Sequence, residues 1–198
     1  MTTTIHLIRH GHHALLGRRL CGRTSDVSLD QLGLQQMQRL ASCIWPIPNR
    51  IQSSPQLRAR ESAAILAANL NLSVEITPAA DEIDMGDWSS RTFIELEHDP
   101  QWRRWNSARS SHSPPNGESM EALRQRIVHH IEQIRRNADS ETVAVVSHAE
   151  PIRTALLHYT GVSFDDFLSV DVDVASISTL VTDERGTHVR QINQQVQA

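Results

Sequence analysis

Short apolar runs alternate along the chain with stretches of helical character, and this alternation restricts the fold more than any other feature. Residues 5–8 and 142–146 are mostly aliphatic, which is typical of short buried strands. Between them, residues 56–70 are rich in alanine and favour a helix. Strands that alternate with helices form a sheet covered on both faces. We therefore expect an α/β fold, a three-layer sandwich with a mostly parallel central sheet flanked by helices.

Other elements follow from capping residues, breaks and spacing. Asp30 is placed to cap a helix over 31–44. A later helix is indicated by apolar residues spaced 3, 4, 4 and 3 apart: Met120, Leu123, Ile127, Ile131 and Ile134. Further strands are expected over 50–52 and 73–77, with a hairpin formed by 175–182 and 187–192. Residues 85–116 are irregular and predict a helical insertion. No linker divides the chain, so we expect residues 1–198 to form a single domain.

Composition excludes several classes of function. The formal net charge is −4, so no global positive field attracts nucleic acid or an anionic membrane. No run approaches the ~18 apolar residues of a membrane span, and the first residues are too polar for a signal peptide. Two cysteines, Cys21 and Cys43, are too few for a disulfide framework. These features predict a cytoplasmic protein, whose oligomeric state (monomer or homodimer) stays open.

Two histidines directly follow predicted strands. His10 comes after the first strand, between Arg9 and Gly11, and His148 follows Ser147 at the end of the 142–146 strand. In open α/β sheets, ligands bind outside the carboxyl ends of the strands. The helix expected after His148 would add unpaired backbone N–H groups, which bind anions. The two histidines therefore mark a candidate anion site.

Charged residues beside other element ends fit phosphoryl transfer. Arg58 follows Ser53-Ser54-Pro55, Glu82 follows the next strand, and Arg23 lies in the first long loop. A guanidinium group meets phosphate oxygens two at a time. An imidazole attacks when its reacting nitrogen is unprotonated, and a carboxylic acid can protonate the leaving oxygen. We favour Glu82 over its neighbours Asp84 and Asp87 as that acid.

Six segments, taken in order, resemble the histidine phosphatase superfamily, also called the phosphoglycerate mutase-like family. The segments are Leu7-Ile-Arg-His-Gly11, Gly22-Arg23 with Val27-Ser-Leu29 and Gly33, Ser53 to Ala63, Asp81 to Trp88, Asn116-Gly-Glu-Ser119, and Val145-Val-Ser-His148. Each alone is weak, but the six come in the family's order across most of the chain. The chain departs from the family pattern at His12, His13, Ser62 and Ala149, and we expect both extra histidines to face the substrate.

The resemblance implies roles for the candidate residues. His10 is the nucleophile that becomes phosphohistidine, while Arg9, Arg58 and His148 hold the transferring phosphoryl group. Glu82 donates a proton to the leaving group and then activates water. Arg23, Gly11, Ala149 and His12 are expected to bind the substrate or its phosphate. The resemblance implies no metal and no cofactor.

The predicted function is hydrolysis of a small phosphomonoester through this phosphohistidine. The chain is short for a phosphoglycerate mutase, which disfavours mutase activity. Three alternatives stay open: a metal site built from His10, His12, His13 and His148, a non-catalytic module that docks a phosphorylated ligand or protein, and a protein phosphohistidine phosphatase. The physiological substrate, whether a sugar phosphate, a phosphoglycerate, a nucleotide-pathway monoester or ribazole phosphate, is not specified by any motif.

Overall fold

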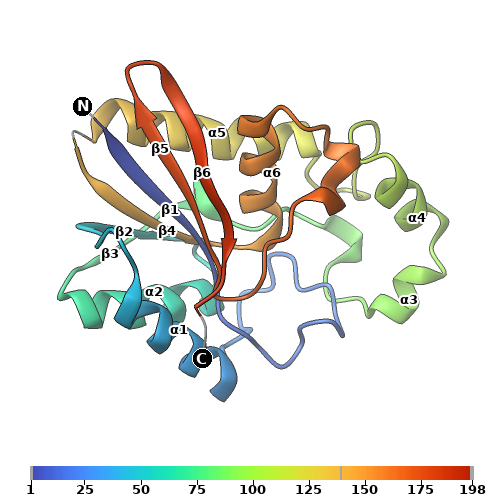
Figure 1. The fold of residues 1–198 in the computed structure, drawn as a ribbon. Helices are drawn as coiled ribbons and strands as arrows, with labels where there is room; N and C mark the ends of the chain where they lie inside the picture. The colour runs from blue at the N-terminus through green and yellow to red at the C-terminus, as the bar shows by residue number, and fades with distance from the viewer. Residues whose placement is uncertain (1, 139, 197–198) are drawn as a thin grey trace.

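A six-stranded mixed sheet forms the centre of the computed structural model, which describes residues 2–138 and 140–196. Figure 1 shows helices on both faces of this sheet. The strands are β1 Thr3–Arg9, β2 Arg50–Ser53, β3 Val74–Ile76, β4 Thr142–Ser147, β5 Ile177–Asp183 and β6 Gly186–Gln194. The α-helices are α1 Gln31–Cys43, α2 Leu57–Leu70, α3 Phe93–Glu97, α4 Pro100–Ser107, α5 Met120–Asn137 and α6 Ala149–Thr160, and the short 3₁₀ helices are η1 Pro78–Ala80, η2 Gly86–Trp88 and η3 Phe164–Ser169.

The strand order is β3-β2-β4-β1-β5-β6. β3, β2, β4 and β1 pair in parallel, whereas β5 and β6 add an antiparallel hairpin at one edge. The expected sandwich with a mostly parallel sheet is therefore confirmed, and the late hairpin lies where the sequence predicts it. No helix among residues 2–138 and 140–196 is long and apolar enough to cross a membrane.

Alternation along the central strands fills two cores. In β4, Val143 and Val145 pack with α5 and α6, while Ala144 and Val146 pack with α1 and α2. This follows from the strand geometry, in which successive side chains point to opposite faces. Because both faces are covered, the central strands read as continuous apolar runs rather than as alternating ones.

The insertion over residues 85–116 has a small core of its own. The rings of Trp88 and Trp102 lie 5.2 Å apart, edge to face, and those of Trp102 and Trp105 lie 5.3 Å apart. Leu96 and Leu123 belong to the same cluster, which packs α3 and α4 against the first turns of α5. In Figure 1 these two helices lie beyond the end of the sheet.

Candidate active site

The sheet register brings the two predicted histidines together. Arg9 at the end of β1 is opposite Ser147 at the end of β4, and the amide of His10 donates to the carbonyl of Ser147 at 3.1 Å. As a result the ring centroids of His10 and His148 lie 5.1 Å apart, edge to face. Both rings are buried, with 3% and 0% of their surface exposed. Parallel pairing of β1 with β4 thus creates the centre of the site.

Hydrogen bonds determine which ring nitrogen of His10 is unprotonated. Nδ1 lies 2.8 Å from the carbonyl of Gly11, which can only accept, so Nδ1 carries the proton. Nε2 is then the unprotonated nitrogen, and it accepts from Nε of Arg58 at 3.3 Å. Burial, followed by the charges of Arg58 and Arg9, holds the pKa of His10 well below its ordinary value. His10 is therefore a neutral imidazole whose Nε2 lone pair faces a cation.

Arg58 is held rigidly beside this nitrogen. It lies in the first turn of α2, is 2% exposed, and donates to the carbonyls of Thr24 and Gly22 at 3.1 and 2.7 Å. Arg9 approaches from the end of β1 and donates to the carbonyl of Val172 at 2.6 Å, while its Nε has no partner among the described residues. Both side chains converge on the pocket that holds His10.

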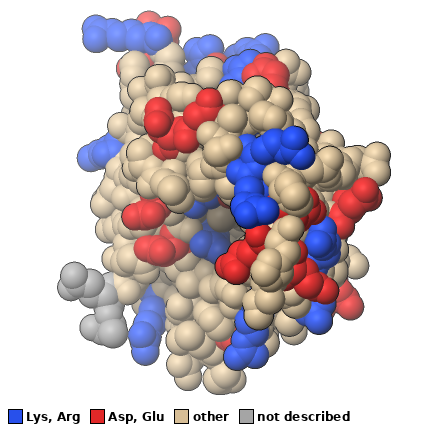
Figure 2. Space-filling view, turned by 90° about the vertical axis from the view of Figure 1, so that its right-hand side faces the viewer, with Lys and Arg blue, Asp and Glu red and all other residues tan. Residues whose placement is uncertain are grey.

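A half-open cavity of about 170 Å³ lies in front of His10. Viewed from the right-hand side of Figure 1, the surface is hollowed, with basic side chains inside the hollow and acidic ones around it (Figure 2). The polar and charged part of the lining is formed by Arg9, His10, His13, Arg19, Arg58, Glu82 and Glu150, and the rest by Leu16, Gly17, Leu20, Cys21, Gly22, Met85, Phe93 and Ala149. The cavity thus has a cationic floor and a largely apolar wall.

Glu82 is one of two carboxyl groups, with Glu150, that line this cavity together with His10. Burial, and next the charge of Glu150, raise the pKa of Glu82 to about 7. A carboxylic acid with such a pKa is substantially protonated near neutral pH and can donate to a leaving oxygen. The geometry and the pKa together fit the acid predicted at this position.

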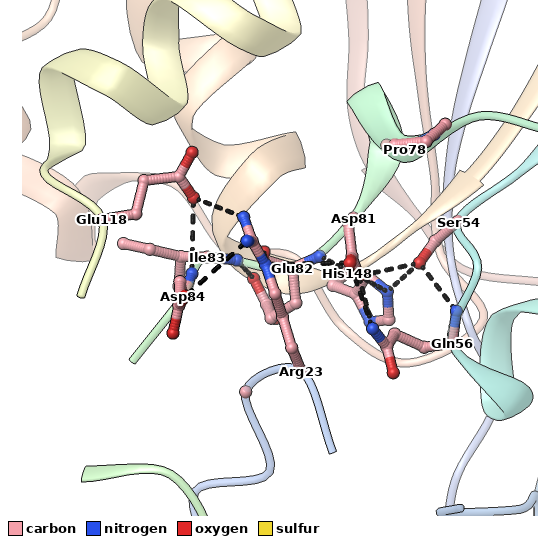
Figure 3. Close-up of polar contacts among 12 residues, drawn as sticks. Arg23, Ser54, Gln56, Pro78, Asp81, Glu82, Ile83, Asp84, Glu118 and His148 are labelled. Atoms are coloured by element: carbon pink, nitrogen blue, oxygen red, sulfur yellow. Dashed lines mark hydrogen bonds and ion pairs between the residues drawn. The ribbon is translucent and has the colours of Figure 1, made fainter. Parts of the chain in front are cut away.

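Two arginines, Arg126 and Arg23, fix the loop that carries Glu82. Arg126 on α5 donates to the carbonyls of Ala79 and Asp81 at 2.8 and 2.9 Å and pairs with Glu118 at 2.9 Å. Glu118 in turn accepts from Arg23 at 2.9 Å. Figure 3 shows Glu118 and Arg23 on one side of the loop, beside Asp84. These contacts hold Glu82 in place without using its carboxyl group.

His148 is tied to the same loop through a serine. Its Nε2 lies 2.7 Å from Oγ of Ser54, and Oγ lies 3.2 Å from Oδ1 of Asp81. The other ring nitrogen, Nδ1, is buried and has no hydrogen-bond partner among the described residues. Burial and the neighbouring charge of Arg58 hold the pKa of His148 well below its ordinary value. His148 is therefore neutral, and one of its ring nitrogens has no partner within the described residues.

Three predicted binding residues, His12, Arg23 and Gly11, do not line the cavity. His12 pairs with Asp30 through Nδ1 at 2.6 Å. Arg23 donates from Nε to the carbonyl of Glu82 at 2.8 Å and lies in the acidic network of Figure 3. Of the four predicted binding residues, Ala149 does line the cavity. Substrate contacts by His12 and Arg23 therefore stay predictions. In this structure Arg23 supports the loop that carries Glu82.

Sequence reasoning missed part of the cavity wall. Glu150 pairs with Arg109 at 2.7 Å and with Arg153 at 2.6 Å. The guanidinium of Arg109 is stacked between the rings of Trp105 and Phe167, 3.9 and 3.4 Å from their centroids. Only the position of Glu150, two residues after His148, could have signalled a role, since nothing local marks Arg109.

The extra histidine at position 13 does face the cavity. His13 is 3% exposed, its ring lies 5.3 Å from that of His10, and its Nδ1 has no partner among the described residues. Burial and the nearby arginines lower its pKa to about 4, so it is neutral at physiological pH. Residues 2–138 and 140–196 contain no group of three or more His, Cys, Asp or Glu side chains arranged to hold a metal ion.

Comparisons with known proteins find similarity over nearly the whole chain. The model of the histidine phosphatase superfamily (branch 1) matches residues 5–195. A bifunctional protein of Mycobacterium tuberculosis is 31% identical over 180 residues, which cover 89% of this chain and 49% of that protein. The chain therefore spans about half the length of this relative.

Two further similarities concern phosphatases. Phosphoserine phosphatase 1 of Hydrogenobacter thermophilus is 31% identical over 145 residues, which cover 72% of this chain and 69% of that protein. The structure of a phosphoserine phosphatase of Entamoeba histolytica in complex with 3-phosphoglyceric acid superposes with a TM-score of 0.86 at 25% identity, covering 98% of each chain.

Proposed function

This chain belongs to the histidine phosphatase superfamily, and from that premise we propose that it hydrolyses phosphate monoesters of small metabolites through a phosphohistidine at His10. The observation that carries the proposal is the state of His10: a buried neutral imidazole whose unprotonated Nε2 faces the guanidinium of Arg58. Such a nitrogen is a ready nucleophile for phosphorus. Phosphatases with small substrates among the relatives support the same reaction class.

In the first step the Nε2 lone pair of His10 attacks phosphorus, and the bond from phosphorus to the alcohol oxygen breaks. Arg9 and Arg58 neutralise the phosphoryl oxygens during transfer. Glu82, protonated because its pKa is about 7, gives its proton to the departing oxygen. The products of this step are the free alcohol and phosphohistidine.

In the second step the ionised Glu82 acts as a base. It takes a proton from a water molecule as that water attacks phosphorus, and the bond from phosphorus to Nε2 of His10 breaks. Inorganic phosphate leaves, and His10 returns to its neutral form with Glu82 protonated again. One carboxyl group can serve both steps because its pKa lies near the working pH.

The cavity favours a small alcohol group. A volume of about 170 Å³ accommodates a phosphate group and a few further atoms, while the open side lets a longer alcohol extend outward. Leu16, Leu20, Met85 and Phe93 provide apolar contact, and the neutral His13 offers one hydrogen bond. This wall suits a metabolite-sized monoester and leaves little room for a folded phosphoprotein.

The decisive experiment compares wild type with His10→Ala, with His112→Ala as a control because His112 is an exposed histidine of the insertion. Protein purified with chelator is assayed on p-nitrophenyl phosphate and a panel of small monoesters, and a phosphoenzyme is trapped rapidly. We expect turnover by wild type and the control, acid-labile phosphate on His10, and a loss of about 10⁴-fold or more in His10→Ala.

Absence of turnover on every monoester, with inorganic phosphate still bound, would instead favour a module that docks phosphorylated ligands. Turnover that survives in His10→Ala would exclude the phosphohistidine route. Activity that chelator abolishes and a divalent metal restores would bring back the metal-dependent alternative.

A further inference from the structure

The hydrogen bonds of Ser54 determine which nitrogen of His148 carries the proton. Both oxygens of the Asp81 carboxylate can only accept, so the 3.2 Å contact with Ser54 uses the single hydroxyl hydrogen of that serine. Oγ of Ser54 must then act as acceptor toward His148, 2.7 Å away. The proton of the neutral imidazole therefore lies on Nε2, and Nδ1 carries the lone pair.

Asp81 is the end point of this line of hydrogen bonds. Its Oδ1 also accepts from the amide of Glu82 at 2.8 Å and from Nε2 of Gln56 at 2.9 Å. Its Oδ2 lies 3.7 Å from Nε of Arg23. Figure 3 shows these donors meeting at Asp81 next to Ser54 and His148. The carboxylate is thus held in one position, with a fixed negative charge 3.9 Å from Nε2 of His148.

We propose that Ser54 and Asp81 are positioning residues which, through His148, let this histidine take up a proton when phosphate binds. In the free site Nδ1 is an unpartnered lone pair, and a phosphate oxygen cannot donate to it unless that oxygen carries a proton. A bound phosphate monoanion therefore passes a proton to Nδ1, so that an O–H bond of the phosphate breaks and an N–H bond forms on His148. Phosphate then remains as the dianion, and Nδ1–H donates to it.

The charges around His148 explain why its proton uptake needs Ser54 and Asp81. The groups that face His148 from β1, α2 and α5 are His10, Arg9, Arg58 and Arg126, and all of them, like burial, lower its pKa. An imidazolium among three arginines is unfavourable unless negative charge is supplied. The phosphate dianion supplies it on the Nδ1 side, and Asp81 supplies it through Ser54 on the Nε2 side.

The proposal rests on phosphate binding by the site in the proposed function, but its test does not require turnover. The protein is labelled with ¹⁵N-histidine, and the resonances of His148 are assigned by their loss in His148→Gln. Nitrogen shifts distinguish the two neutral tautomers from the imidazolium. Spectra are recorded from pH 5 to 9 without ligand and with saturating inorganic phosphate, for wild type, Asp81→Asn, Ser54→Ala and the control Asp84→Asn.

Asp84→Asn is a matched control because it removes the same charge from the same loop. Asp84 lies 3.7 Å from Arg23 and accepts from the amide of Gly86 at 2.9 Å, and no contact with Ser54 or His148 is found within the described residues. We expect the Nε2–H tautomer in free wild type and the control, and an imidazolium when phosphate is bound at pH 7. In Asp81→Asn and Ser54→Ala the imidazolium should disappear about one pH unit lower.

Kinetics on p-nitrophenyl phosphate provide a second readout. Asp81→Asn should lower kcat about 10- to 100-fold and weaken inhibition by inorganic phosphate about 10-fold at pH 7. Asp84→Asn should stay within about twofold of wild type in both. A free wild type with the Nδ1–H tautomer, or a His148 that stays neutral with bound phosphate, overturns the proposal even if a variant does not fold.

The outcomes also separate this proposal from the proposed function. If wild type binds phosphate with an imidazolium at His148 but turns over no monoester, the proposed hydrolase function is refuted and the proposed proton uptake by His148 stands. If wild type hydrolyses monoesters while His148 titrates identically in Asp81→Asn and Asp84→Asn, the proposed hydrolase function stands and the proposed role of Ser54 and Asp81 is refuted.

Discussion

The two ends of the cavity are built in different ways. The phosphate end is formed by residues at the limits of regular elements: His10 after β1, His148 after β4, and Arg58 in the first turn of α2. These residues are at most 3% exposed, and the positions of His10 and His148 follow from strand register. The alcohol end is formed by loop residues such as Leu20 and by the insertion that carries Phe93.

This difference separates chemistry from selectivity. Groups anchored to the sheet have little freedom to move, as electrostatic catalysis requires. A wall carried by a long loop and an insertion can change sequence and shape without disturbing the sheet. We therefore expect changes at the phosphate end to affect every substrate equally, and changes at the alcohol end to affect substrates differently.

Arg58→Lys should have the largest effect of the three changes that test this division. Lysine keeps a positive charge but cannot donate at once to His10, Thr24 and Gly22 as Arg58 does. We expect kcat/KM to fall about 10³-fold for all monoesters alike. Steady-state kinetics on the substrate panel measure this, with Arg60→Lys as the control because Arg60 is exposed on the same helix. A loss confined to some substrates would contradict the division.

Glu82→Gln should have an intermediate effect that depends on the leaving group. Alkyl phosphates need the proton and should lose about 10²- to 10³-fold in kcat, whereas p-nitrophenyl phosphate, with its acidic phenol, should lose much less. Since the pKa of Glu82 is raised to about 7, the proton donor is present below that pH and is lost above it. The wild-type kcat/KM should therefore decline as pH rises through about 7.

The acid side of this profile should be flat over a wide range. The pKa of His10 is held well below its ordinary value, so the nucleophile stays unprotonated until the pH is low. In Glu82→Gln the alkaline decline should vanish, while Glu97→Gln, a change at an exposed carboxyl of the insertion, should keep the wild-type profile. An unchanged alkaline limb in Glu82→Gln would assign that limb to another group.

Phe93→Ala should have the smallest effect and the most selective one. Phe93 contributes apolar wall beyond the phosphate end, so its loss should lower kcat/KM about 5- to 10-fold for monoesters with bulky apolar alcohols. Inhibition by inorganic phosphate should not change. Ile94→Ala is the control, because Ile94 is the next residue on α3 and is 73% exposed. An equal loss for all substrates would show that the wall also positions the chemical groups.

The same division explains what the sequence could reveal. The proximity of His10, Arg58, Glu82 and His148 was predictable because each follows a short motif at the end of an element, and parallel pairing brings such ends together. The insertion was predictable as irregular, although the capping box of Thr92 and Glu95 marks the start of α3 and could have been identified beforehand.

Arg109 and Glu150 were not predictable in the same way. Arg109 pairs with Glu150 of the cavity wall because two rings from distant segments, Trp105 and Phe167, hold its guanidinium. No periodicity or cap records such a contact. The inward orientation of His13 and the outward one of His12 likewise depend on tertiary partners, here the carboxylate of Asp30.

The close contact between Gly11 and Gly33 restricts which residues the chain can carry, apart from any catalytic role. A Cβ added to Gly11 would lie 2.6 Å from the carbonyl oxygen of Gly33, and a Cβ on Gly33 would collide with the carbonyl oxygen of His12. The start of α1 therefore lies directly against the backbone that carries His10. In a map of mutational tolerance, position 33 should appear as intolerant as position 10, the proposed nucleophile, although Gly33 does not line the cavity. The intolerance at position 33 would reflect the close approach of two backbone segments of the same chain. It would not identify Gly33 as a catalytic residue.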